Sequence, residues 1–403
     1  MSDIELRLQE LQDEGLYRRM RLISGPQGPR VLLDGRPVLL LCSNNYLGLA
    51  DHPRVRQAAA DAAMRWGVGA GASRLVCGNM TIHRRLEERL TEFKRAERCV
   101  LFGSGYLANV GVVSALAREG DVVFSDELNH ASLVDGCRLS KARTFVYRHR
   151  DPEHLAWGLS EAEGRGALIV TDGVFSMDGS IAPLREIVEL ARRHDARVVV
   201  DEAHATGTVG PGGRGTVAAA GLEDEVDVVV GTLGKALGAY GAYACCDQST
   251  ARWLVNTART LVYSTGLPPP VAAAALAAVE LLASELRLVK RLERNATVLR
   301  ESLDERGLST GPARSHILPL VLGGADETVA ASRRALDGGV FAQAIRPPTV
   351  PEGTSRLRLS VMASHRRSEL RAAARTIAEA AGRLSAPASA AGSRGERGLA
   401  RAA

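Results

Sequence analysis

The sequence predicts an α/β fold with a mostly parallel central sheet, followed by a smaller α+β unit. Between about residues 53 and 245, short apolar runs alternate with helix-like segments. These runs are apolar on both faces, as expected of strands that helices cover from both sides. The chain has 403 residues, which is enough for two or three domains of about 150 residues each.

Six apolar runs are the expected strands of the central sheet. They are rich in Val and Ile, whose β-branched side chains fit a pleated surface. In chain order they read CVLF, DVVFS, RTFVY, ALIVTDG, ARVVVDEAH and VDVVVGT. Apolar residues at helical spacing predict helices between them at 83–95, 106–118, 152–160 and 184–194.

The flanking segments have patterns of their own. Residues 1–22 alternate apolar and charged residues at helical spacing, which predicts a helical N-terminal arm. The segment VLLDGRPVLLLCS predicts a hairpin that turns at Asp34-Gly35. The Ala/Leu-rich segment 270–306 predicts one connecting helix. Beyond it we expect strands in HILPLVLG, FAQAIRPP and SRLRLSVM, and helices at 326–337 and 366–382.

These patterns predict four regions. They are an N-terminal arm with a short extended segment (1–52), a large α/β domain (53–285), a C-terminal α+β domain (286–384) and a tail (385–403). The tail is poor in large apolar residues, so we expect it to be disordered.

Composition narrows the class of protein. The chain is 45% hydrophobic and 24% charged, with a net charge of +5 and no long basic run, which disfavours nucleic-acid binding. A mildly basic surface still suits acidic small molecules or an acidic carrier protein. The six cysteines match no zinc signature and predict reduced thiols, so we expect no metal site. The charged N-terminus is unlike a signal peptide, and no long uncharged apolar stretch predicts a membrane span; we expect a cytoplasmic protein.

Lys235, in the glycine-rich turn of VVVGTLGKALG, raises the question of nucleotide binding. A Walker A loop would need Gly at Val229 and Ser or Thr at Ala236, so the template fails at its turn and at its metal ligand. DEAH at 201–204 is reminiscent of an ATPase motif, but no phosphate loop precedes it. GVGAGA at 67–72 follows a helical pattern instead of a strand, so it predicts a flexible loop and not a dinucleotide site.

Lys235 and Asp201 together fit a pyridoxal phosphate (PLP) site. Such a site needs a lysine for a Schiff base, a carboxylate on the pyridine nitrogen and donors for the phosphate. Asp201 ends one predicted strand and Lys235 follows the next, so both should emerge at the same sheet edge. Thr232 stands three residues before the lysine and could bind the phosphate. Singly, each residue has an ordinary explanation: a strand-end Asp is often a helix cap, and a lysine in a glycine turn is usually solvated.

Longer motifs carry a family resemblance from about residue 15 to 383. In order they are SNNYLGL, GAGASRLVCGN, FGSGYLANVG, DELNHASLVDG, TDGVFSMDGSIAPL, VDEAHATGTVGPGGRG, GTLGKALG, LVYSTGLPP and AIRPPTVPEGTSRLRLSVMASH. The chain resembles the α-oxoamine synthases, PLP enzymes of the aspartate aminotransferase superfamily (fold type I). The resemblance implies a large domain with a mostly parallel sheet, a smaller C-terminal domain and a homodimer with active sites at the interface.

The resemblance also implies roles for individual residues. Lys235 would form the Schiff base and move the proton at the substrate α-carbon, Asp201 would pair with the pyridine nitrogen, and His204 would bond the phenolic oxygen. His130, which alone would read as a helix-start or core histidine, would stack on the ring. The expected remaining cofactor contacts are Gly105 and Tyr106 at a helix start, Ser176, Thr232, and Ser264 or Thr265 from the partner subunit.

The amino-acid substrate would be bound by Arg358, a guanidinium that fits a carboxylate, with Asn44 as its helper. Arg356 or another strand arginine could be merely solvated. The resemblance places Arg18 and Thr349 near the acyl donor. Arg18 alone would read as part of a solvated basic helix.

Within the family, AIRPPTVPEGTSRLR is similar to the members that condense L-alanine with a pimeloyl thioester, with loss of carbon dioxide, to 8-amino-7-oxononanoate in biotin biosynthesis. The carrier would be CoA or an acyl carrier protein. The alternatives are a glycine C-acetyltransferase or another α-oxoamine synthase, a DEAH-type ATPase, and a cofactor-free scaffold. Glu202 and Ala205 stand where relatives often have Asp and Gly, a departure that bears on substrate preference more than on catalysis.

Overall fold

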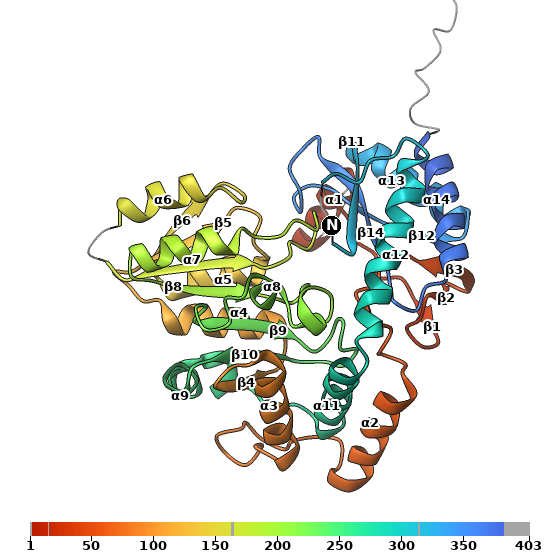
Figure 1. The fold of residues 1–403 in the computed structure, drawn as a ribbon. Coiled ribbons are helices and arrows are strands. Elements are labelled where there is room, and N and C mark those ends of the chain that lie inside the picture. Colours follow the sequence, from red (N-terminus) through yellow and green to blue (C-terminus); the bar gives the residue numbers. More distant parts are fainter. Residues whose placement is uncertain (1, 15, 163–164, 313–314, 383–403) are drawn as a thin grey trace, which may run out of the picture.

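The computed structural model describes residues 2–14, 16–162, 165–312 and 315–382. A seven-stranded sheet forms the centre of its larger part, and the C-terminal unit lies beside it (Figure 1). All strands are parallel except β10, which is antiparallel to both neighbours. In spatial order the strands are β4 (Arg98–Phe102), β10 (Ala242–Cys246), β9 (Val228–Thr232), β8 (Ala196–Asp201), β7 (Ala167–Asp172), β5 (Val122–Asp126) and β6 (Arg143–Tyr147). The predicted α/β fold with a mostly parallel sheet is confirmed.

Alternate side chains of each strand enter two separate apolar layers. Val198 and Val200 of β8 face one layer, and Val199 faces the other. The first layer receives α3 (Thr81–Lys94), α6 (Pro152–Ser160), α7 (Leu184–Arg193), α8 (Thr216–Ala220) and α11 (Pro269–Ser284). The second receives α4 (Gly105–Leu116), α5 (Ala131–Ser140), α9 (Gln248–Thr257) and α10 (Arg259–Val262). Both faces are therefore buried, which explains why the strands lack polar alternation.

Strand β10 has no counterpart among the predicted strands. Its sequence, AYACC, has neither the β-branched residues nor the alternation that predict a strand. It is fixed by its neighbours, since Ala242–Cys246 pair with both β4 and β9. Tertiary pairing decides this element, not local propensity.

The N-terminal and C-terminal segments meet in a second sheet. The predicted hairpin is present as β2 (Arg30–Leu33) and β3 (Arg36–Leu40), with β1 (Ile23–Ser24) beside it. Asp34 and Gly35 both have positive φ, at 50° and 80°, as a tight hairpin turn requires. Strand β12 (Val340–Phe341) adds to β3 in parallel, so the extended N-terminal segment shares a sheet with the C-terminal unit.

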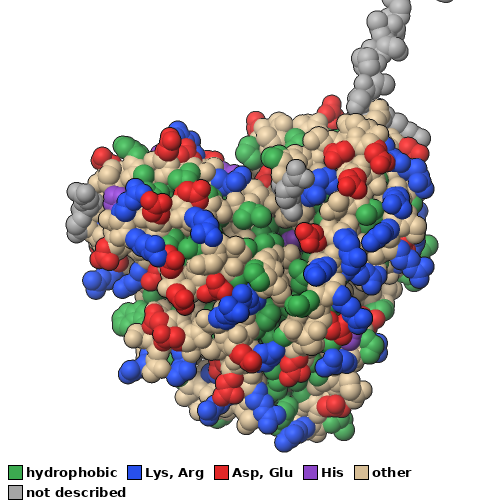
Figure 2. All heavy atoms as spheres, viewed as in Figure 1, with side chains coloured by type: hydrophobic (Ala, Val, Ile, Leu, Met, Phe, Trp, Pro, Cys, Tyr) green, Lys and Arg blue, Asp and Glu red, His purple; other side chains and the backbone are tan. Residues whose placement is uncertain are grey.

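The C-terminal unit contains a three-stranded antiparallel sheet of β11 (Ile317–Gly323), β14 (Ser355–Ser360) and β13 (Gln343–Ile345). Helices α12 (Arg287–Asp304), α13 (Ala325–Asp337) and α14 (Arg367–Gly382) pack around it. In the space-filling view, acidic and basic side chains are mixed over the large sheet, and basic ones are more frequent over α12 and α14 (Figure 2).

Two predicted helices differ from the structure. The arm predicted over 1–22 is helical only as α1 (Asp3–Asp13), ahead of the glycine at position 15, a residue type that commonly ends helices. The segment 270–306 forms two helices, α11 and α12, and not one. Helix α11 packs on α2 (Pro53–Trp66) and α12 packs on α14, so different partners separate them at Glu285.

All six cysteines are free. Across the described residues, helices long and apolar enough to cross a membrane are absent. The four-region division stays a prediction, and its tail at 385–403 lies outside the described residues.

Candidate active site

Acidic residues end three adjacent parallel strands at the carboxyl edge of the central sheet. They are Asp126 on β5, Asp172 on β7 and Asp201 on β8, and Thr232 ends β9 next to them. This edge is where open α/β sheets bind ligands. Lys235 follows β9 by three residues, as the sequence predicted, and lies close enough to Asp201 and Asp172 for their charges to affect its pKa.

Asp201 is held rigidly by two donors. The Asn109 side-chain amide donates to Oδ2 at 2.6 Å, and the Ala203 N–H donates to Oδ1 at 2.8 Å. Asn109 also donates to Ser132 Oγ at 2.8 Å. The Asp201 carboxylate is almost fully buried, so these contacts determine the direction in which it can meet a ligand.

The environment of Lys235 favours a neutral amine. Loss of hydration lowers the pKa of Lys235, and the nearby Arg358 guanidinium lowers it further, against the opposing effect of Asp201 and Asp172. Its Nζ lies 2.8 Å from His204 Nε2. A lysine that is to act as a nucleophile or a base needs this neutral form.

Tyr46, which the sequence analysis assigned no role, connects His204 to Arg358. Its hydroxyl lies 2.6 Å from His204 Nδ1, 2.9 Å from Asn44 Oδ1 and 3.3 Å from Arg358 Nη2. The Arg358 Nη2 group also donates to Asn44 Oδ1 at 3.2 Å. Arginine can only donate, so Asn44 Oδ1 is an acceptor, and the Tyr46 O–H must donate to it. The Tyr46 oxygen then accepts from Arg358 and from His204 Nδ1–H.

This arrangement determines the tautomer of His204. With its proton on Nδ1, the neutral ring presents the Nε2 lone pair to Lys235, which donates to it. Burial moves the pKa of His204 well below its ordinary value, and the charges of Lys235 and Arg358 add to the shift, so the ring stays neutral. Lys235, His204, Tyr46 and Arg358 therefore form one continuous chain of hydrogen bonds.

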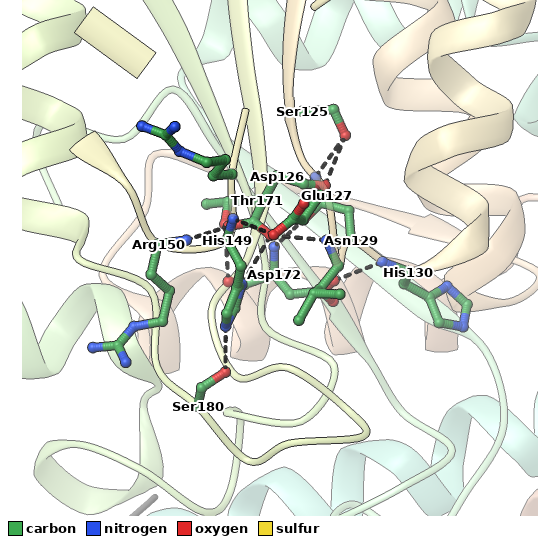
Figure 3. Close-up of polar contacts among 12 residues, drawn as sticks. Ser125, Asp126, Glu127, Asn129, His130, His149, Arg150, Thr171, Asp172 and Ser180 are labelled. Atoms are coloured by element: carbon green, nitrogen blue, oxygen red, sulfur yellow. Dashed lines mark hydrogen bonds and ion pairs between the residues drawn. The ribbon is translucent and has the colours of Figure 1, made fainter. Parts of the chain in front are cut away.

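His130 begins α5 beside the same edge (Figure 3). Its backbone N–H donates to Asp172 Oδ2 at 2.7 Å, and its Nδ1 lies 2.7 Å from Ser132 Oγ. Asn129 accepts the Asp172 N–H at 3.0 Å and donates to Ser125 and to the Val170 carbonyl. Burial lowers the pKa of His130, while burial and the charge of Asp201 raise that of Asp172 well above its usual range. Both the ordinary helix-start interpretation and a site role fit His130.

The start of α4 lies beside Thr232, the last residue of β9. Gly105 lies beside Thr232, whose Oγ1 accepts the Gly234 N–H at 3.2 Å. The first N–H groups of a helix have no intrahelical acceptor, so those of Gly105 and Tyr106 can bind an anion. The Tyr106 hydroxyl donates to Asp135 at 2.6 Å on an exposed surface.

Arg358 is the arginine of β14 that reaches the site. Its Nε donates to the Ser176 carbonyl at 2.5 Å, which brings Ser176 to the site through its backbone. Its Nη1 makes no hydrogen bond within the part of the chain that the structure describes, and so is available to a carboxylate. Arg356, for which solvation remained an open alternative, is buried and forms an ion pair with Asp178.

Four predicted site residues do not join this cluster. Ser264 and Thr265 line a separate pocket with Phe102 and Gly103, and Lys235 is not among the described residues that line it. Arg18 is on the exposed segment after α1, and Thr349 is in an exposed turn, its N–H bonded to the Arg346 carbonyl. Their roles stay predictions.

Glu202 points away from the site. It forms an ion pair with Lys94 and accepts from Thr216 Oγ1 at 3.0 Å and from the Val217 N–H at 2.8 Å. In the DEAH segment, the side chains of Asp201 and His204 thus lie in the site, whereas that of Glu202 lies on the opposite side. This arrangement differs from that of an ATPase motif, whose acidic residues act on a metal-bound nucleotide. In the described residues no group of His, Cys, Asp and Glu side chains has a geometry that could hold a metal ion.

Comparisons with known proteins show the family of the chain. Residues 36–377 match the family described as aminotransferase class I and II. The 8-amino-7-oxononanoate synthase of Citrifermentans bemidjiense is 50% identical over 382 residues, covering 94% of this chain and 97% of that protein. The enzyme of the same name from Geobacter metallireducens is 52% identical over 366 residues, with 90% and 94% covered.

Two solved structures are similar to this chain over most of its length. A serine palmitoyltransferase variant from S. paucimobilis with a bound PLP–myriocin aldimine has a TM-score of 0.90 at 32% identity, covering 95% of this chain and 97% of that one. The 8-amino-7-oxononanoate synthase from Francisella tularensis has a TM-score of 0.75 at 26% identity, with 86% and 99% covered.

Fold and site together define a PLP-dependent enzyme of fold type I. The chain belongs to the aminotransferase class I and II family, and within it to the α-oxoamine synthases, where it is most like the 8-amino-7-oxononanoate synthases.

Proposed function

We propose that this chain catalyses the decarboxylative condensation of L-alanine with a pimeloyl thioester, giving 8-amino-7-oxononanoate, carbon dioxide and the free thiol carrier. Relatives that carry this enzyme name are about 50% identical over nearly the whole chain. The structural observation that carries the proposal is the hydrogen-bond chain from Lys235 through His204 and Tyr46 to Arg358. This chain of hydrogen bonds joins the Lys235 amine, whose pKa is lowered by burial, to a guanidinium that can bind a carboxylate, as a reaction on an amino acid requires.

The donor set fits PLP. Asp201, oriented by Asn109, would meet the pyridine nitrogen, and the start of α4 with Thr232 would bind the phosphate. His130 would lie against the ring, and Lys235 would hold the cofactor covalently. The bound cofactor supplies an electron-withdrawing ring that stabilises negative charge at the amino-acid α-carbon.

The protein's own groups then have distinct tasks. Arg358, with Asn44 beside it, binds the alanine carboxylate and so fixes which bonds of the α-carbon face Lys235. Lys235, whose pKa is lowered by burial, takes the α-proton and later returns one. His204 keeps the amine oriented by accepting its N–H.

The acyl donor and the second subunit belong to the same proposal. Arg18 and Thr349 are the proposed contacts to the pimeloyl thioester, and Ser264 or Thr265 of a second copy would complete the phosphate site. Both pairs lie outside the Lys235 cluster of a single chain, which is compatible with a site completed by dimerisation. Whether the thiol carrier is CoA or an acyl carrier protein is decided by comparing the two donors.

The test is a steady-state assay of the purified enzyme with L-alanine and pimeloyl-CoA, followed by mass spectrometry of the product. We expect 8-amino-7-oxononanoate, with glycine and acetyl-CoA much poorer substrates. A preference for glycine would assign the chain to a different α-oxoamine synthase reaction. Lys235→Ala should abolish both turnover and the borohydride-sensitive visible band; a band that persists in this variant would refute the role of Lys235.

A further inference from the structure

The loop between β7 and α7, residues 175–181, connects the central sheet to the residue proposed to bind the substrate carboxylate. We call it the 175–181 loop, and the inference about it rests on the proposed function. The Ser176 carbonyl accepts Arg358 Nε, and Asp178 forms an ion pair with Arg356. The two arginines are two residues apart on β14, so their side chains leave the same face of the strand. The loop therefore contacts both arginines and, together with Asn44 and Tyr46, restrains the Arg358 guanidinium.

On its other side the loop is anchored by His149 (Figure 3). Ser180 Oγ lies 2.9 Å from His149 Nε2, and the imidazole packs edge-on against Phe175, with ring centroids 4.4 Å apart at 87°. His149 Nδ1 lies 2.9 Å from Asp126 Oδ1 at the end of β5. Phe175 and Ser180 of the loop thus both contact His149, which is itself bonded to Asp126 of the central sheet.

Asp126 is a rigid support for this contact. Its carboxylate is buried and also accepts the N–H groups of Leu128 at 2.9 Å and Arg150 at 3.0 Å. Since a carboxylate accepts, His149 donates from Nδ1, and the neutral ring then accepts the Ser180 O–H at Nε2. A protonated ring would instead donate to the Ser180 oxygen, so the contact persists in both protonation states.

The order Ser180–His149–Asp126 has the distances of a nucleophilic triad, but the loop around it serves a different purpose. The neighbouring Gly179 N–H donates to the Phe175 carbonyl at 2.8 Å, and the Phe175 N–H donates to the Ser180 carbonyl at 2.9 Å. These bonds close a tight turn instead of offering donors to an oxyanion. At Gly179 a side chain would collide with the Ile317 carbonyl of β11, so the turn is packed against the C-terminal sheet.

We propose that Ser180 and His149 are positioning residues, which hold the 175–181 loop so that Arg358 is aligned with the carboxylate of the amino-acid substrate. Ser180 and Asp178 anchor the loop from opposite sides, one to the central sheet and one to β14. Binding of a carboxylate by a guanidinium depends on alignment, and small displacements of positioning groups have large kinetic consequences. Removal of the Ser180 hydroxyl should therefore weaken recognition of the carboxylate specifically.

The experiment compares L-alanine with L-alaninamide, which keeps the amine and the methyl group but lacks the carboxylate. Dissociation constants are measured on the holoenzyme from the change in the visible spectrum on ligand addition. In Ser180→Ala we expect the dissociation constant of L-alanine to rise about five- to tenfold, that of L-alaninamide to stay unchanged, and cofactor content to match wild type. Asp178→Asn, which weakens the anchor on the other side, should show the same selectivity.

Two controls separate positioning from general destabilisation. Ser180→Thr keeps the hydroxyl and should restore the affinity for L-alanine. Ser332→Ala removes another half-buried serine hydroxyl, which bonds the Ala342 carbonyl at 2.7 Å, and should change neither ligand's affinity.

The outcomes are distinct. Equal weakening of both ligands, or an unchanged affinity for L-alanine in both Ser180→Ala and Asp178→Asn, would overturn the positioning role while the proposed function stands. If wild-type holoenzyme shows no spectral response to L-alanine, the proposed function fails and this inference fails with it.

Discussion

Replacing Tyr46 by Phe tests the proton arrangement of the site, because it removes one oxygen and keeps the ring. The Tyr46 ring is fully buried and packs edge-on against His316, with centroids 4.1 Å apart, so the phenyl ring should remain in place. The lost oxygen accepts from His204 Nδ1–H and from Arg358 Nη2 and donates to Asn44. Arg358 keeps its bond to Asn44, whereas His204 keeps no acceptor at Nδ1.

The magnitude follows from that one unsatisfied donor. A buried donor left without a partner costs about 1–3 kcal/mol, which corresponds to a factor of about 5 to 150 in an equilibrium constant. The His204 tautomer with its proton on Nε2 avoids this cost, so we expect the proton to move there in the variant. Nε2–H would then face Lys235, which loses its acceptor.

The assay is two-bond ¹H–¹⁵N correlation on cofactor-free protein labelled with ¹⁵N-histidine. Wild-type His204 should carry its proton on Nδ1, and Tyr46→Phe should shift the population toward Nε2. Tyr243→Phe is the matched control, because it removes another buried tyrosine hydroxyl, 2.9 Å from Thr206, on β10. That control should lower stability without changing the His204 tautomer. A wild-type His204 protonated on Nε2 would refute the hydrogen-bond assignment.

Two further predictions concern stability. Lys94→Ala leaves the Glu202 carboxylate buried without its ion-pair partner, so urea titrations should show a free energy of unfolding that is lower by about 3–5 kcal/mol. Lys94→Met combined with Glu202→Leu should recover much of this loss. Equal losses in the two variants would contradict the ion-pair explanation. Burial lowers the pKa of His365 from 6.5 to about 4, so the folded state resists a proton that the unfolded state accepts. Above about pH 6.5, His365 should therefore have no effect on the free energy of unfolding. Between about pH 6.5 and about pH 4, it should lower the free energy of unfolding by about 1.4 kcal/mol for each unit of decreasing pH. Thermal unfolding of His365→Gln should show a smaller acid loss than wild type; an identical slope would exclude this histidine as a source.

The sequence predicted those parts of the molecule that local pattern controls. The six expected strands are all present, and Asp201, His204 and Lys235 meet because parallel strands end at a common edge. The polar partners of these residues were missed. Asn109 bonds Asp201 across 92 positions of sequence, and Tyr46 meets His204 across 158, so periodicity gives no indication of either contact. A signal for Asn109 was available, since it is the one polar residue in the run LANVGVV of a buried helix.

Arg358 has an electrostatic role in addition to its role in orientation. It is always charged, and its field contributes to the lowered pKa values of Lys235, His204 and His316, the last reaching about 3. An arriving amino acid brings a carboxylate to Arg358 and an ammonium group to Lys235. The carboxylate offsets the guanidinium charge, so the depressed pKa of Lys235 should rise once the substrate is bound. The lowered pKa of Lys235 favours the neutral amine that would form the covalent bond to the cofactor, and a rise after substrate binding would make the released amine a stronger base toward the proton of the α-carbon. Because the 175–181 loop and Tyr46 both contact Arg358, the contacts proposed to orient the substrate would also set the distance over which the guanidinium charge acts on Lys235.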